Sequence, residues 1–205
     1  MNTRARGLFI VFEGVDGSGK STQVARMVRW LGAGGHTVVS TREPHDCEAG
    51  RRIREMARSG ERVSAEQELA WFQEQRRLHV HDVIEPALAA GQIVVCDRYY
   101  FSSAAYQGAR GLDPERILRE SEAEFPTPDL VLLLDLAPEA GLDRVASRGA
   151  PAEPVFEDQE RLQAVAKIYR SFAFPFFVRV DASGQEEAVA ASLQQIVSER
   201  LGLLR

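Results

Sequence analysis

The feature that most constrains the fold is a glycine-rich run, GVDGSGKS at positions 14–21, which follows a short apolar stretch. The run matches the pattern G-x-x-x-x-G-K-[ST], whose glycines let backbone N–H groups wrap a polyphosphate at the start of the next helix. Residues 8–12 are mostly apolar, and apolar residues recur at helical spacing between positions 24 and 31. A strand, this loop and a helix in that order indicate an α/β fold with a nucleotide-phosphate site; the alternative is a glycine-rich turn without a ligand.

Two side chains in the run supply the chemistry that a phosphate site needs. Lys20 can reach the β and γ phosphates of a nucleotide, and the hydroxyl of Ser21 can ligate Mg²⁺. Both follow Gly19, so they stand at the positive end of the predicted helix, where anions are favoured.

Composition restricts the class of protein. The 205 residues are 44% hydrophobic and 27% charged, which predicts one ordered domain, and the net charge of −5 provides no basic surface for a nucleic acid or an anionic membrane. The basic N-terminus precedes only five apolar residues, and no apolar run has the length of a membrane helix. Cys47 and Cys96 lack metal-ligand spacing, so we expect a cytoplasmic protein.

Strand-like and helix-like segments alternate along the whole chain without a linker or repeat. We predict a P-loop three-layer α/β fold, with a five-stranded parallel sheet flanked by helices. Pro86 predicts a helix break, and the irregular residues 149–156 predict a short lid, with a solvent-exposed turn as the alternative. Further strands are predicted at 36–40, 92–96, 130–134 and 176–180, and further helices at 49–58, from 64 onward, and at 112–125, 138–148, 157–173 and 186–204.

Charged residues follow the predicted strands where ligands of open α/β sheets bind. Arg42 follows the second strand, although a solvated loop charge would look the same. Asp97 and Arg98 follow the third, where a carboxylate can hold Mg²⁺ and an arginine can bind a phosphate. Asp135 ranks below Asp97 as a metal ligand because no basic residue adjoins it.

One long predicted helix carries Phe72 and Arg76 on the same face. An aromatic ring can stack on a base, and an arginine one turn later can donate to a base carbonyl. A core phenylalanine beside a surface arginine has the same sequence pattern. Residues 102–108 add hydroxyl and amide groups that can bind a base edge or merely cap a turn.

These motifs together resemble the thymidylate kinases, and their order covers essentially the whole chain. The resemblance rests on the phosphate loop with Asp16, the TREP sequence at 41–44, Phe72 with Arg76, and the run from Asp97 to Gly108. It implies a homodimeric enzyme that transfers the γ-phosphoryl group of MgATP to dTMP.

The resemblance also implies a role for each matching position. Lys20, Asp16, Arg98 and Arg148 are expected in catalysis, and Ser21 and Asp97 in holding Mg²⁺. ATP is expected at Gly14, Gly17, Ser18, Gly19, Lys20, Ser21, Thr22 and Arg144. The residues expected to bind dTMP are Asp16, Arg42, Phe72, Arg76, Arg98, Ser102, Ser103, Tyr106 and Gln107.

Two departures from the family pattern stand out. TREP is followed by HDCE at 45–48, where Gly-Gly-Thr is common, and neither Gly17 nor Ser18 is the arginine that some members carry in the loop. Val155 stands where a lid arginine is usual, so Arg148 is the nearest candidate for transition-state charge. The alternatives are a P-loop kinase for another deoxynucleotide or deoxynucleoside, and a silent nucleotide-binding homologue.

Overall fold

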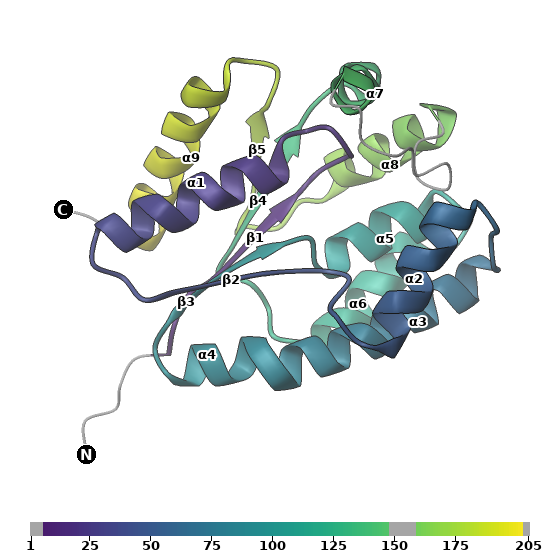
Figure 1. The fold of residues 1–205 in the computed structure, drawn as a ribbon, viewed down its shortest axis with the longest axis horizontal. Helices are drawn as coiled ribbons and strands as arrows, with labels where there is room; N and C mark the ends of the chain where they lie inside the picture. Colours follow the sequence, from purple (N-terminus) through teal and green to yellow (C-terminus); the bar gives the residue numbers. More distant parts are fainter. Residues whose placement is uncertain (1–5, 148–158, 203–205) are drawn as a thin grey trace.

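The computed structural model describes residues 6–147 and 159–202. Five parallel strands form one sheet in the order β2-β3-β1-β4-β5 (Figure 1). The strands are β1 (Phe9–Glu13), β2 (Val38–Arg42), β3 (Ile93–Asp97), β4 (Leu130–Asp135) and β5 (Phe177–Asp181). The predicted parallel sheet is confirmed, whereas the predicted lid and Arg148 lie outside the described residues.

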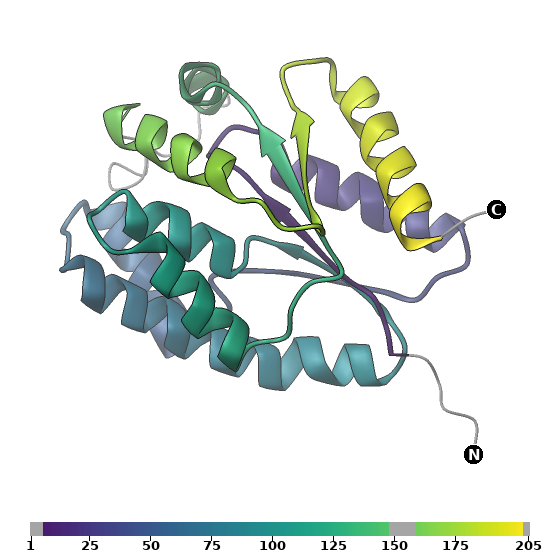
Figure 2. The ribbon, with the colours of Figure 1, turned by 180° about the vertical axis from the view of Figure 1, so that it is seen from behind.

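Helices cover both faces of the sheet and make the three layers that the alternating sequence predicts (Figures 1 and 2). On one face lie α1 (Lys20–Ala33) and α9 (Glu186–Leu201). The remaining helices are α2 (Glu48–Ser59), α3 (Ala65–His79), α4 (Glu85–Ala89), α5 (Tyr100–Gly108), α6 (Pro114–Glu124), α7 (Pro138–Ser147) and α8 (Gln159–Ser171), of which α3, α4, α5, α6 and α8 contribute to the core on the opposite face.

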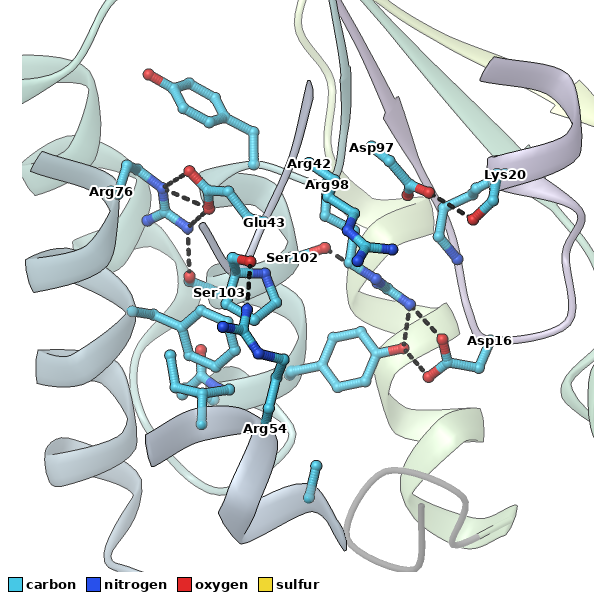
Figure 3. Close-up of a pocket in the computed structure, with 18 of the residues that line it drawn as sticks. Asp16, Lys20, Arg42, Glu43, Arg54, Arg76, Asp97, Arg98, Ser102 and Ser103 are labelled. Atoms are coloured by element: carbon cyan, nitrogen blue, oxygen red, sulfur yellow. Dashed lines mark hydrogen bonds and ion pairs between the residues drawn. The ribbon is translucent and has the colours of Figure 1, made fainter. Parts of the chain in front are cut away.

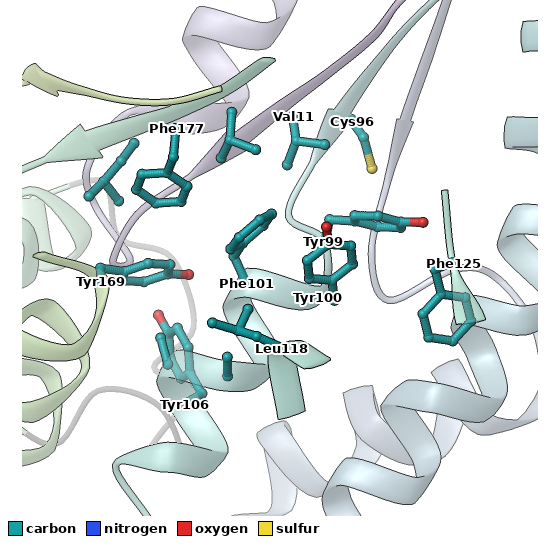
Figure 4. Close-up of a cluster of buried hydrophobic side chains, with 14 of the residues drawn as sticks. Val11, Cys96, Tyr99, Tyr100, Phe101, Tyr106, Leu118, Phe125, Tyr169 and Phe177 are labelled. Carbon is teal, nitrogen blue, oxygen red and sulfur yellow. The ribbon is translucent and has the colours of Figure 1, made fainter. Parts of the chain in front are cut away.

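Each strand sits where its side chains can be buried. The central strands β1, β3 and β4 are apolar on both faces, while the edge strand β5 mixes buried and accessible residues and the edge strand β2 has only partly buried and exposed ones. In β1, Ile10 and Phe12 face α1 and α9, and Phe9 and Val11 join the opposite core. That second core is rich in aromatic rings, with Phe101 at its centre (Figure 4). Two cores therefore hold the sheet rigid beneath its carboxyl edge.

Four strands end one residue later than hydrophobicity predicts, and β2 ends two residues later, because the ladder extends to a charged residue at each carboxyl end. Glu13 pairs in register with Leu133, and Asp97 pairs with both Phe12 and Arg42. Backbone pairing does not depend on side-chain polarity, so the apolar pattern alone misses the last position. These terminal acids stand at the edge that carries the cleft described below.

The predicted break at Pro86 is wrong. Helical backbone runs from Ala65 to Ala89, with a π-helical turn at Val80–Ile84 before α4. This wider turn places Pro86 in the first turn of α4, where a missing N–H group costs little. No helix in the described ranges is long and apolar enough to cross a membrane.

Candidate active site

A cleft of about 480 Å³ opens at the carboxyl ends of β1, β2 and β3, between the phosphate loop and helices α2, α3 and α5 (Figure 3). It brings together most of the residues predicted to bind ligands. They are Asp16, Gly17, Gly19, Lys20, Ser21, Arg42, Phe72, Arg76, Asp97, Arg98, Ser102, Ser103, Tyr106 and Gln107. The predicted Gly14, Ser18, Thr22 and Arg144 do not line the cleft.

The phosphate loop has the backbone that its glycines allow. Gly14 and Gly17 adopt φ values of 141° and 78°, which residues with a Cβ atom rarely adopt. A Cβ at Gly17 would lie 2.0 Å from the carbonyl oxygen of Gly141 in α7. The loop and α7 therefore meet through bare backbone, and this close packing fixes the loop in place.

Lys20 begins α1 and is buried under the loop. Its Nζ donates to the carbonyl oxygen of Val15 at 2.8 Å. Burial and the nearby Arg98 guanidinium lower the pKa of Lys20 to about 8, although Asp16 and Asp97 oppose the shift. An arriving phosphate would supply the negative charge that favours the protonated amine.

Ser21 and Asp97 form a pair of oxygen donors beside the loop. The Ser21 hydroxyl donates to Oδ2 of Asp97 at 2.7 Å, and Oδ1 is buried without a hydrogen-bond partner. Hard oxygen donors with an unsatisfied carboxylate oxygen fit Mg²⁺. No cluster of three His, Cys, Asp or Glu side chains suited to a metal occurs in the described part of the chain, so phosphates and water would complete the coordination.

Arg98 occupies the centre of the cleft, and its guanidinium makes four hydrogen bonds. Nη1 donates to the carbonyl oxygen of Gly14 and to Ser102, both at 3.1 Å, and Nη2 donates to Asp16 at 2.6 Å and to the Tyr106 hydroxyl at 3.3 Å. Its φ of 71° is rare for a side-chain-bearing residue. Burial raises the pKa of Asp16, but Arg98 and Lys20 more than offset it, and the net pKa is lowered. Asp16 is therefore an anion that holds Arg98.

Arg76 is a buried residue, so the alternative of a surface arginine beside a core phenylalanine is wrong. Its guanidinium makes three contacts of 2.6–3.1 Å with Glu43 and one of 3.0 Å with Ser103. The rings of Tyr99 and Phe125 lie 5.4 and 5.6 Å from its central carbon. Arg76 and Phe72 both line the cleft, so the predicted pair is brought to one wall.

Helix α5 presents the remaining predicted polar groups. The Ser102 hydroxyl donates to Glu13 at 2.6 Å and accepts from Arg98, while Ser103 accepts from Arg76. The Gln107 amide nitrogen donates to Glu68 at 2.8 Å. Each of these three side chains therefore has a hydrogen-bond partner in the protein, and none of them caps α5.

Arg42 and Arg144 differ in their surroundings. Arg42 is exposed at the cleft, and its side chain makes no hydrogen bond or ion pair with any other described residue. Arg144 lies outside the cleft and donates to the carbonyl oxygens of Ala182 and Ser183 at 3.1 and 3.5 Å. Its predicted contact with adenine stays a prediction.

Several residues that shape the site were not assigned from the sequence. Glu13 and Glu43 are buried acids, and Arg54 lines the cleft while donating to the Pro44 carbonyl oxygen at 3.1 Å and to Asp46 at 2.7 Å. A charged residue directly after an apolar stretch is the sequence signal that could have identified Glu13. Their partners come from distant segments, which no local pattern reveals.

The HDCE segment after TREP has a defined structure. The His45 amide donates to Gln75 at 2.7 Å, and its ring stacks on His79 with centroids 4.9 Å apart. A Cβ at Gly50 would lie 1.9 Å from the His45 carbonyl oxygen, so the following helix packs closely under the loop.

Comparison with known proteins agrees with this arrangement. The thymidylate kinase family profile matches residues 12–193. The chain is 42% identical to the thymidylate kinase of Akkermansia muciniphila over 195 residues, covering 95% of this chain and 93% of the relative. It is 42% identical to the thymidylate kinase of Desulfotalea psychrophila over 176 residues, covering 86% of this chain and 87% of the relative. It is 39% identical to the probable thymidylate kinase of Archaeoglobus fulgidus over 196 residues, covering 96% of this chain and 97% of the relative. Neither alternative function receives support from these matches, and the chain belongs to the thymidylate kinase family, the ATP-dependent kinases of dTMP.

Proposed function

We propose that the cleft transfers the γ-phosphoryl group of ATP to dTMP by holding the two nucleotides end to end. The observation that carries this proposal is the continuity of one cleft from Lys20 and Ser21 to Phe72 and Arg76. The residues proposed to hold the donor phosphates and those proposed to contact the base line the same cleft, and Arg98 lies between Lys20 and Arg76 (Figure 3). Phosphoryl transfer requires this kind of positioning more than it requires covalent chemistry.

The donor lies on the phosphate loop. Loop amides and Lys20 bind the β and γ phosphates, and Ser21 with Asp97 holds Mg²⁺. The bound ion supplies positive charge that offsets the charge of the transferring group. Support comes from the Ser21–Asp97 hydrogen bond and from the unpartnered oxygen of Asp97.

The acceptor phosphate binds near Arg98 and Arg42. Arg98 is preorganised by Asp16 and Ser102, whereas Arg42 has no competing partner among the described residues. An oxygen of the dTMP phosphate is the nucleophile and already carries charge, so the reaction needs no strong general base. Asp16 sits where it can orient the acceptor, and Tyr106 beside it would crowd a ribose 2′-hydroxyl.

Thymine stacks on Phe72, and its polar edge meets Arg76 and the α5 residues Ser102, Ser103 and Gln107. Glu43 holds the Arg76 guanidinium in place, which lowers the entropy lost when a base carbonyl accepts from it. The buried surroundings strengthen that hydrogen bond.

Charge for the transition state comes from Arg98 and, when the nucleotides are bound, from Arg148 in the segment that follows α7. Adenine lies against Arg144 outside the cleft. The enzyme acts in the cytoplasm as a homodimer with a mass in solution of twice that of the chain, which light scattering measures; a single-chain mass would contradict the dimer.

Product analysis tests the reaction. Purified protein with dTMP, ATP and Mg²⁺ should form dTDP and ADP in equal amounts, as separated by ion-exchange chromatography. Omission of Mg²⁺ and the Lys20→Ala variant should each abolish both products. ADP formation without dTDP would contradict the proposed acceptor.

A further inference from the structure

Glu68 is a buried carboxylate that lies beside the cleft without lining it. It belongs to the first turn of α3 and is 1% exposed. Its Oε1 accepts from the Gln107 amide nitrogen at 2.8 Å, and its Oε2 accepts from Arg110. Arg110 also donates to the Val63 carbonyl oxygen at 2.6 Å, so the carboxylate is braced between α3 and the end of α5.

This contact determines which way the Gln107 amide turns. A carboxylate beside a guanidinium can only accept hydrogen bonds, so the amide nitrogen must face Glu68. The Gln107 amide oxygen therefore faces away from Glu68, and it is buried without a hydrogen-bond partner. Gln107 lines the cleft, which makes this acceptor the polar group that it can offer a ligand.

Arg76 supplies the opposite polarity on the same cleft. Its guanidinium has donors and no acceptor. The base end of the cleft therefore combines one donor-only side chain with one amide whose free atom is an acceptor. Thymine and uracil present a carbonyl next to a ring N–H, which matches this pair. Cytosine presents an amino group next to an unprotonated ring nitrogen, which opposes it.

We propose that Glu68 is a specificity-determining positioning residue, which selects an oxo-pyrimidine over an amino-pyrimidine by fixing the orientation of the Gln107 amide. The inference rests on the proposed placement of the base against Phe72 and Arg76. It concerns how the site distinguishes bases, beyond the binding of dTMP itself.

Glu68→Gln is the direct test. An amide at position 68 can donate as well as accept, so the Gln107 amide can turn and offer its nitrogen to the cleft. The ratio of kcat/KM for dTMP to that for dCMP should fall about tenfold, the effect of one mismatched hydrogen bond. The ratio of dTMP to dUMP should stay constant, because these bases share the same polar edge. Glu74→Gln, at an exposed position of α3, is the matched control and should change neither ratio.

Two further variants keep the inference testable if Glu68→Gln folds poorly. Glu68→Asp retains an acceptor-only group and should keep most of the discrimination. Gln107→Met removes the amide and should itself lower the dTMP-to-dCMP ratio, and adding Glu68→Gln to it should have no further effect. Thermal unfolding establishes that each variant is assayed below its midpoint.

A parallel fall of kcat/KM for dTMP, dUMP and dCMP in Glu68→Gln would show that Glu68 only supports the structure. An unchanged dTMP-to-dCMP ratio in Gln107→Met would equally overturn the inference. A wild-type protein that forms no dTDP would contradict the proposed function instead, so the two failures are distinguishable.

Discussion

The Glu43 carboxylate holds the Arg76 guanidinium through both of its oxygens, at 2.6–3.1 Å, in a site almost closed to solvent. Removing one member of such a pair leaves an uncompensated buried charge. Glu43→Gln should therefore destabilise the protein by about 3–5 kcal/mol in urea unfolding. It should also raise KM for dTMP more than KM for ATP, because Arg76 loses its orientation.

The exposed pair of Arg77 and Glu124 provides the control for this variant. Glu124→Gln should cost less than about 1 kcal/mol, since solvent screens the pair, and should leave both KM values unchanged. Equal losses of stability for Glu43→Gln and Glu124→Gln would show that the buried Glu43–Arg76 pair contributes no more to stability than an exposed ion pair.

Lys20 should give the stability a distinctive pH dependence. Its pKa in the folded protein is about 8, below the ordinary lysine value of 10.5, so the unfolded chain binds more protons between these values. Burying the protonated amine costs stability in full below pH 8, and this cost falls as pH rises toward 10.5. The wild type should gain stability relative to Lys20→Met over this range, by an amount on the order of 3 kcal/mol.

Urea titrations at pH 7.5, 9 and 10.5 measure that difference. Lys167→Met, at an exposed site on α8, should show no comparable trend. A constant difference between wild type and Lys20→Met across the range would contradict the lowered pKa.

Arg98→Ala should separate acceptor binding from donor binding. Arg98 is proposed to bind the dTMP phosphate, so its loss should raise KM for dTMP at least tenfold and lower kcat, with a smaller change in KM for ATP. Initial rates with each nucleotide varied in turn provide these constants. Equal increases in both KM values would argue against an acceptor role.

Gly141→Ala should displace the phosphate loop, because Gly141 in α7 packs directly against it. A Cβ there would lie 2.4 Å from the Asp16 carbonyl oxygen, so α7 and the loop must move apart. We expect a loss of about 1–3 kcal/mol in stability and weaker ATP binding by calorimetry. Gly32→Ala, in α1 with open space around it, should instead be neutral or stabilising. Unaltered ATP affinity in Gly141→Ala would show that the contact does not position the loop.

Arg148→Ala tests the source of transition-state charge. If Arg148 acts on the transferring group, kcat should fall by at least 100-fold while KM for both nucleotides changes little. A pre-steady-state measurement of the chemical step provides the most direct comparison. Unchanged turnover would remove Arg148 from the catalytic residues.

The sequence predicts the parts of this molecule that depend on local pattern. The apolar strands, the phosphate loop and the shared face of Phe72 and Arg76 are all present in the structure. These features follow from backbone periodicity and from residue types at fixed spacing.

Long-range pairing explains most of what the sequence could not predict. Glu43 and Arg76 are 33 residues apart, and Glu68 meets Gln107 across 39, so their contacts depend on how α3 packs against α5 and the loop after β2. Pro86 failed as a break because a preceding π-helical turn repositions it, and a single proline gives no sign of that turn.

A competition assay among nucleotides tests the central claim most directly. With MgATP as donor, the purified protein should show its highest kcat/KM for dTMP, above dCMP, dGMP and thymidine, because Phe72, Arg76 and Arg98 together require a pyrimidine with an oxo edge and a 5′-phosphate. The preference over dUMP should be smaller, because it depends on the thymine methyl group alone. A clear preference for thymidine, or no transfer to dTMP, would contradict the account.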